Sequence, residues 1–153
     1  MANFEPAIEI TLKNEGGLVD DPADPGGLTK FGLSQRSYPN VDIKNLTIED
    51  AKAIYLKDFW KFGGITDQSI ANKIFDSYVN MEHAAIKIAQ KTVGFSKQDG
   101  VYGPVTETAI NSFTAENFLP LYRANLVQHY KDIVAANPEE SKFLEGWENR
   151  ANQ

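Results

Sequence analysis

The sequence predicts a mainly α-helical protein with a small β-hairpin or irregular loop near its N-terminus. Apolar residues recur at helical spacing along most of the 153-residue chain, whereas proline, glycine and aspartate concentrate in residues 18–34. The composition, 42% hydrophobic and 11% aromatic, is sufficient for a buried core and unlike that of disordered chains. Since no linker-like stretch divides the chain, we expect one compact domain, 1–153, with lobes at 1–66 and 67–153.

The first predicted helix has an apolar face with i, i+3, i+4, i+7, i+8 spacing, formed by Phe4, Ala7, Ile8, Thr11 and Leu12. It should end at Gly16-Gly17, because glycine readily adopts the left-handed conformation of a helix cap. Residues 18–34, LVDDPADPGGLTKFGLS, favour turns and a short hairpin. This is the only segment in which the sequence predicts strands.

The remaining helices have recognisable start and stop signals. Thr47, with Asp50 three residues later, predicts an N-cap for a helix over 48–60 that Gly63-Gly64 ends. Pro104 suits the first turn of another helix. Further helices are predicted over 68–80, 84–89, 118–136 and the C-terminal segment EESKFLEGWENR, where Trp147 should anchor the helix and Arg150 should pair with a carboxylate.

Charge and composition exclude several classes of protein. The formal net charge of −6 and the lack of lysine and arginine clusters argue against nucleic-acid binding and against adhesion to an anionic membrane surface. No apolar run approaches the roughly 18 residues of a membrane-spanning helix. The N-terminal residues do not resemble a secretory signal, so we expect synthesis in the cytoplasm. The absence of cysteine excludes disulfides and thiolate metal sites.

The first candidate for chemistry is Glu15, which precedes a glycine pair at the predicted end of a helix. The partial negative charge of a helix C-terminus, and partial burial, would favour a protonated acid there. Glycosidases usually place two carboxyl groups beside the scissile bond, and the loop after Glu15 offers Asp20, Asp21 and Asp24. On composition alone, however, such aspartates are turn formers and such a glutamate is a solvated helix end.

A family resemblance favours the enzymatic interpretation. The segment EGGLVDDPADPGGLTKFGLSQRSYP resembles the signature of glycoside hydrolase family 108: Glu-Gly-Gly at a helix end, an Asp-Pro-x-Asp-Pro-Gly-Gly loop, a threonine and an aromatic-glycine pair. AIYLKDFWKFGGI and KIFDSYVNMEHAAIKIAQKTVG resemble later family segments, and DGVYGPVTETAI and FLEGWENR resemble its C-terminal peptidoglycan-binding-like portion. Residues 81–83, Met-Glu-His, depart from the small residue and glycine that are common in the family.

The resemblance implies a lysozyme-like helical domain that hydrolyses the β-1,4 bond between N-acetylmuramic acid and N-acetylglucosamine, as phage endolysins and secretion-linked muramidases do. It implies that Glu15 is the catalytic acid. A weaker similarity to phage lysozymes points to Asp24 with Thr29 as the second group, with Asp20 and Asp21 as competitors. Candidate substrate-binding residues are Asp21, Gly27, Tyr55, Trp60, Tyr78 and Asn80. Core packing is the alternative for the three aromatic residues, and helix capping for Asn80.

We expect the partner to be a peptidoglycan glycan strand, which a monomer would meet in the periplasm or cell wall after release. No cofactor or metal is expected, because His83 and His129 lack a second ligand at metal spacing. A lytic transglycosylase and a non-catalytic peptidoglycan-binding module remain alternatives. A calcium loop built from the aspartates lacks the EF-hand spacing, and PGGLTK lacks the order of a phosphate-binding loop.

Overall fold

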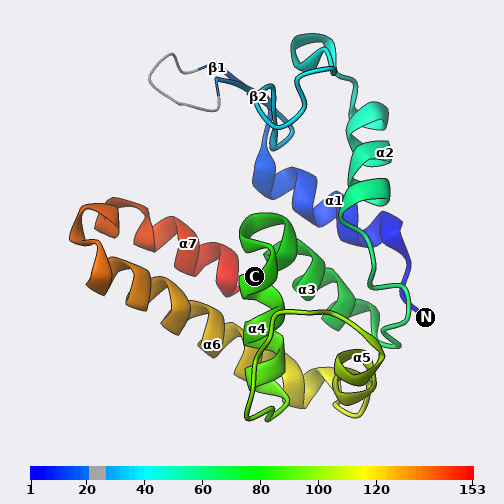
Figure 1. Ribbon diagram of the computed structural model, residues 1–153, viewed down its shortest axis with the longest axis vertical. Helices are drawn as coiled ribbons and strands as arrows, with labels where there is room; N and C mark the ends of the chain where they lie inside the picture. The colour runs from blue at the N-terminus through cyan, green and yellow to red at the C-terminus, as the bar shows by residue number, and fades with distance from the viewer. Residues whose placement is uncertain (21–26) are drawn as a thin grey trace.

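The computed structural model describes residues 1–20 and 27–153 (Figure 1). Within those ranges the chain forms seven α-helices, two short 3-10 helices and one three-stranded antiparallel sheet. The predicted mainly helical fold is therefore confirmed, as is the position of the strands near the N-terminus. In Figure 1 the sheet and α2 lie at one end of the molecule, α4 and α5 lie toward the other, and α1 and α3 lie between them.

Helix α1, Phe4–Glu15, buries the predicted face and ends at Gly16. The φ of Gly16 is 75°, as expected for a glycine that ends a helix, but its ψ of −161° is extended rather than left-handed helical. Few residues other than glycine adopt this combination. Gly16 therefore leads the chain away from α1 into strand β1, Leu18–Asp20.

The sheet has the order β1-β2-β3, with β2 at Leu28–Lys30 and β3 at Leu33–Ser34. Leu18 pairs with Lys30, and Lys30 pairs with Leu33. Two residues, Phe31 (φ 53°) and Gly32 (φ 81°), join β2 to β3. Positive φ at both positions is the geometry of a type I′ turn, whose twist matches that of antiparallel strands.

Helix α2, Ile48–Asp58, follows a 3-10 turn at Ile43–Asn45. The predicted N-cap at Thr47 is present as part of a capping box, since the Thr47 side chain accepts from the Asp50 amide and the Asp50 side chain accepts from the Thr47 amide. The helix ends at Asp58 and not at the predicted Trp60. The amides of residues 59 and 60 both donate to the Tyr55 carbonyl, so the chain leaves the helix as two aromatic rings turn inward.

Helix α3, Gln68–Met81, is the central element and contacts α1, α4 and α6 (Figure 1). Its buried face includes Ile70, Ile74 and Phe75, each no more than 1% exposed. Helix α4, His83–Thr92, begins only two residues after α3 ends, and Glu82 between them has a φ of 50°. An abrupt change of direction thus separates the two helices.

The C-terminal part consists mainly of helices, which are α5 at Pro104–Asn111, α6 at Ala115–Ala136, a 3-10 helix at Pro138–Phe143 and α7 at Leu144–Ala151. Helices α6 and α7 lie side by side (Figure 1). As predicted, Trp147 anchors α7, because its ring stacks on Tyr130 of α6 with centroids 5.1 Å apart. None of the helices in the described ranges has the length and apolar character needed to span a membrane.

Candidate active site

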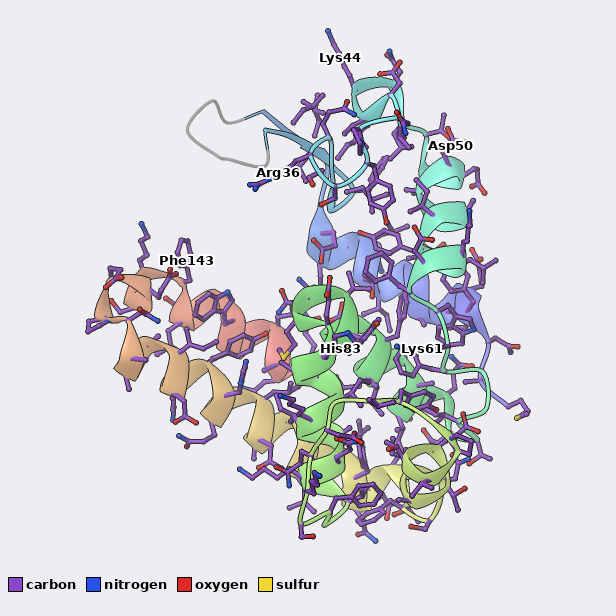
Figure 2. The ribbon with its side chains drawn as sticks, viewed as in Figure 1. Arg36, Lys44, Asp50, Lys61, His83 and Phe143 are labelled. Carbon is purple, nitrogen blue, oxygen red and sulfur yellow. The ribbon has the colours of Figure 1, made fainter. Side chains whose placement is uncertain are left out.

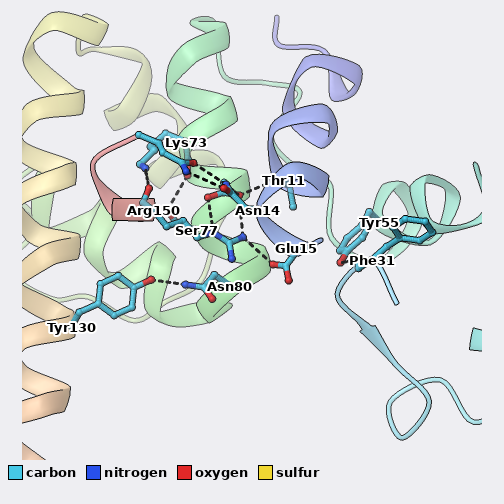
Figure 3. Close-up of polar contacts among 12 residues, drawn as sticks. Thr11, Asn14, Glu15, Phe31, Tyr55, Lys73, Ser77, Asn80, Tyr130 and Arg150 are labelled. Atoms are coloured by element: carbon cyan, nitrogen blue, oxygen red, sulfur yellow. Dashed lines mark hydrogen bonds and ion pairs between the residues drawn. The ribbon is translucent and has the colours of Figure 1, made fainter. Parts of the chain in front are cut away.

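Glu15 is the last residue of α1, and its side chain is 19% exposed. Its Oε1 atom accepts a hydrogen bond from Nη2 of Arg150 at 2.9 Å (Figure 3). Arg150 belongs to α7, so an ion pair joins the end of the first helix to the last helix. The sequence predicted a carboxylate partner for Arg150, and the structure identifies two of them.

The second partner is Asp76 in the buried part of α3, whose side chain is 4% exposed. Its carboxylate accepts from Nε and Nη2 of Arg150 at 3.1 and 3.0 Å. It also accepts from Thr11 Oγ1 and Asn14 Nδ2, both at 3.1 Å. Burial by itself would lower the pKa of Arg150, but its interactions with Asp76 and Glu15 outweigh burial and raise it. Arg150 is therefore a permanent cation that fixes the position of Glu15.

Lys73 completes the polar cluster behind Glu15. Its Nζ atom donates to the backbone carbonyl of Arg150 at 2.8 Å, near the C-terminus of α7, where a cation is favourable. Burial lowers the pKa of Lys73 to about 8. Arg150 thus contacts Glu15, and Asp76 and Lys73 in turn contact Arg150 (Figure 3).

Gly32 lies against the other side of Glu15. A Cβ atom at this position would stand 2.8 Å from Oε2 of Glu15 and 2.6 Å from the Tyr55 hydroxyl. The turn is held by that hydroxyl, which donates to the Phe31 carbonyl at 2.7 Å. Burial is the main cause of the raised pKa of Tyr55. Sequence reasoning did not select Gly32 as a site residue, although its signal was present in the Phe31-Gly32 pair.

A polar groove of about 460 Å³ begins at Gly32 and runs between the sheet, the end of α2 and the α3–α4 junction. The junction is marked in Figure 2 by His83, the first residue of α4. The groove lining includes Gly32, Ser34, Tyr38, Asp58, Phe59 and Glu82. The Tyr38 hydroxyl donates to Oδ2 of Asp58 at 3.0 Å. Burial, followed by this bond, raises the pKa of Tyr38 to about 12.

Tyr55 and Tyr78, two of the predicted sugar contacts, lie in the core, and their predicted roles stay predictions. Tyr55 is 1% exposed and Tyr78 is 8% exposed, so both rings belong to the core. The Tyr78 hydroxyl accepts from Lys61 Nζ at 3.0 Å, which occupies its polar end. Aromatic residues at helical spacing fit core packing and a binding groove equally well, and here core packing prevails.

Trp60 also packs in the core rather than beside Glu15. Its ring lies edge-on to Phe4, Phe62 and Phe75, with centroids 5.6, 5.9 and 5.4 Å away. Phe4 begins α1 and Glu15 ends it, and eleven helical steps separate them by about 16 Å. This packing places Trp60 near the start of α1, and its predicted role in substrate binding stays a prediction.

The structure describes the positions of three of the other predicted site residues, Gly27, Thr29 and Asn80. Gly27 precedes β2 with a φ of 68°, and Thr29 lies half-buried in the middle of β2, opposite Ser34 of β3. Asn80 is exposed near the end of α3 and donates to the Tyr130 hydroxyl. Their predicted roles remain predictions. Asp21 and Asp24 lie outside the described residues.

Comparisons with known proteins assign both halves of the chain. Residues 8–81 match the family model described as Glycosyl hydrolase 108, and residues 84–152 match the model described as Predicted Peptidoglycan domain. The chain is also similar to the structure of Brucella abortus SagA, at 28% identity, covering 97% of this chain and 88% of that one, with a TM-score of 0.78. No curated protein matches the chain. The two family matches meet at the α3–α4 junction, whereas the predicted lobe boundary at residue 66 stays a prediction.

Proposed function

We propose that this chain, which belongs to the glycosyl hydrolase 108 family and carries a peptidoglycan domain after the family-matched residues, is an N-acetylmuramidase. It is a glycoside hydrolase that acts on peptidoglycan. The proposed bond is the β-1,4 linkage between N-acetylmuramic acid and N-acetylglucosamine, and the proposed acid is Glu15.

The position of Glu15 carries this proposal. It is half-buried at a helix end, where Arg150 contacts Oε1 and the side-chain-free Gly32 lies beside Oε2. Arg150 can donate to Oε1 whether or not the other oxygen carries a proton. Oε2 is then the atom that would hold the proton and transfer it. Because the polar groove begins at Gly32, a glycan in the groove would lie within reach of this carboxyl group.

The proposed reaction uses Glu15 as general acid. Its proton passes to the glycosidic oxygen of N-acetylglucosamine as the bond to C1 of N-acetylmuramic acid breaks. A water molecule adds to C1, and its proton passes to a second carboxylate. Asp24, aided by Thr29, is the proposed second group, and Asp20 and Asp21 are its competitors. Thr29 lies in β2 of the same small sheet that places Gly32 against Glu15.

Mass spectrometry of digested cell wall tests this function against its rivals. Wild-type enzyme should release fragments with a reducing N-acetylmuramic acid end. An anhydro end would indicate a lytic transglycosylase, and an absence of cleavage would indicate a binding module.

The Glu15→Gln variant tests the acid itself. Glutamine keeps an oxygen for Arg150 but provides no acidic proton, so cleavage should be lost while the thermal unfolding temperature changes little. Normal cleavage by this variant would refute the assignment of Glu15.

We further propose that the enzyme acts as an endolysin-type monomer in the periplasm or cell wall after release from the cytoplasm. The nature of its substrate supports this location, since peptidoglycan lies outside the cytoplasmic membrane. Fractionation of producing cells before and during lysis would test it, and sedimentation of the purified chain would test the monomer.

A further inference from the structure

The polar groove that begins at Gly32 contains carboxylates that the proposed acid chemistry does not use. Asp58 stands at the end of α2, and Glu82 stands at the α3–α4 junction. Both are exposed, and both affect the Tyr38 hydroxyl between them, Asp58 by a hydrogen bond and Glu82 through its charge. The described residues that line the groove include no lysine, arginine or histidine. The groove therefore attracts hydrogen-bond donors and repels anions.

We propose that this groove is a sugar subsite that accepts the neutral N-acetylglucosamine unit of the glycan and rejects the N-acetylmuramic acid unit. The proposal rests on the proposed function in one respect, that the ligand is a peptidoglycan glycan. It assigns Asp58 and Glu82 as residues that contact the sugar. By selecting which sugar unit occupies the groove, they determine which glycosidic bond of the glycan lies at Glu15.

The chemistry of the two sugars supports this selection. N-acetylglucosamine presents hydroxyl and amide donors, and carboxylates are the strongest side-chain acceptors for them. N-acetylmuramic acid carries in addition a lactyl group, which ends in a carboxylate or in a peptide that bears carboxylates. Bringing such an anion against two carboxylates without a cation is unfavourable.

The size and lining of the groove suit a sugar. Its volume of about 460 Å³ lies within the range of about 300–1,000 Å³ that is typical of small-molecule sites. Tyr38 and Phe59 supply ring surface, and Ser34 supplies a hydroxyl. Because Gly32 belongs both to the lining and to the contact with Glu15, a sugar held here would be adjacent to the proposed acid.

The backbone conformation of Glu82 allows this residue to be replaced without straining the fold. Its φ of 50° disfavours every residue with a Cβ, so Glu82→Gly should not destabilise the fold through backbone strain. Glu82→Gln keeps the side-chain size but removes the charge. The matched control is Glu139→Gln, at an exposed glutamate in the 3-10 segment Pro138–Phe143, away from the groove.

Binding of two probes to the full chain tests the proposal. The Glu15→Gln background suppresses turnover, and amide chemical shifts report where each probe binds. The neutral probe is a β-1,4-linked N-acetylglucosamine trimer, and the anionic probe, matched in length, is the corresponding trimer of N-acetylmuramic acid with free carboxylates.

The neutral trimer should shift the amides of Gly32, Ser34, Val79 and Glu82. Glu82→Gln and Glu82→Gly should each weaken binding of the neutral trimer about tenfold, whereas Glu139→Gln should leave it unchanged. The anionic probe should bind at least about tenfold more weakly than the neutral trimer. This difference in affinity should become smaller in Glu82→Gln and at high salt.

The proposal is overturned if the neutral trimer shifts amides away from the groove, if both probes bind equally well, or if the Glu82 variants bind the neutral trimer as tightly as the parent. Hydrolysis of the neutral trimer in the Glu15→Gln background would refute the role of Glu15 and leave the groove assignment intact, because binding is read at separate residues.

Discussion

Replacing Arg150 with glutamine should destabilise the fold by about 3 kcal/mol. The change removes the guanidinium from Asp76, whose side chain is 4% exposed, and from Glu15, whose side chain is 19% exposed. Removing one partner of a buried ion pair typically costs about 3–5 kcal/mol, because the remaining charge has no compensation.

The lower end of that range applies here for two structural reasons. Asp76 keeps its hydrogen bonds from Thr11 and Asn14, so its carboxylate is not left without donors. Arg150 itself is 17% exposed, so solvent already screens part of the interaction. For a chain of this length, about 3 kcal/mol corresponds to a decrease in Tm of about 6–12 °C.

Urea unfolding followed by circular dichroism measures the effect, with Arg123→Gln as the control. Arg123 donates to a backbone carbonyl at the exposed C-terminus, so its replacement should change stability by less than about 0.5 kcal/mol. The double variant Arg150→Gln, Asp76→Asn removes the uncompensated charge and should be more stable than Arg150→Gln alone. A loss below about 1 kcal/mol for Arg150→Gln, or strict additivity in the double variant, would refute the reasoning.

Three further substitutions test the surroundings of Glu15. Gly32→Ala should reduce cleavage about 100-fold, because the new methyl group meets Oε2 of Glu15 at 2.8 Å and displaces it; unchanged kcat would contradict the close contact. Tyr55→Phe should cost about 1 kcal/mol of stability in thermal unfolding, because the bond to the Phe31 carbonyl is lost. Burial lowers the pKa of Lys73 to about 8, so the unfolded chain binds more protons above that pH, and stability should rise between about pH 8 and pH 10. Lys73→Met should abolish that rise, and a rise that persists would assign it to another group.

The helices were largely predictable because their signals are local. The capping box at Thr47, the proline at the start of α5 and the glycine after α1 each act within one helical turn. The end of α2 was not predictable, because it depends on rings that pack against distant helices. The rings of residues 59 and 60 pack against Tyr78 and Phe75 of α3, respectively, where α2 ends. The sequence of α2 and its neighbouring residues does not indicate these distant contacts.

The candidate site divides in the same way. The place of Glu15 at a helix end was predictable, since the Glu-Gly-Gly motif is contiguous. Its partner Arg150 is 135 positions away, and the sequence showed only that some carboxylate would be needed. The aromatic residues were ambiguous because a ring at helical spacing suits a core or a groove. Tyr55 entered the core, and Tyr38, which no helical pattern marked, reached the groove.

The ion pairs around Arg150 connect the two family-matched regions at the proposed acid. Glu15 and Asp76 belong to residues 8–81, whereas Arg150 belongs to residues 84–152. Lys73 extends the connection through the Arg150 carbonyl. A displacement of α7 would therefore remove a hydrogen bond from Glu15 and a cation from Asp76 at once. The peptidoglycan domain is thus a structural part of the site that positions Glu15, and not only a neighbouring region of the same chain.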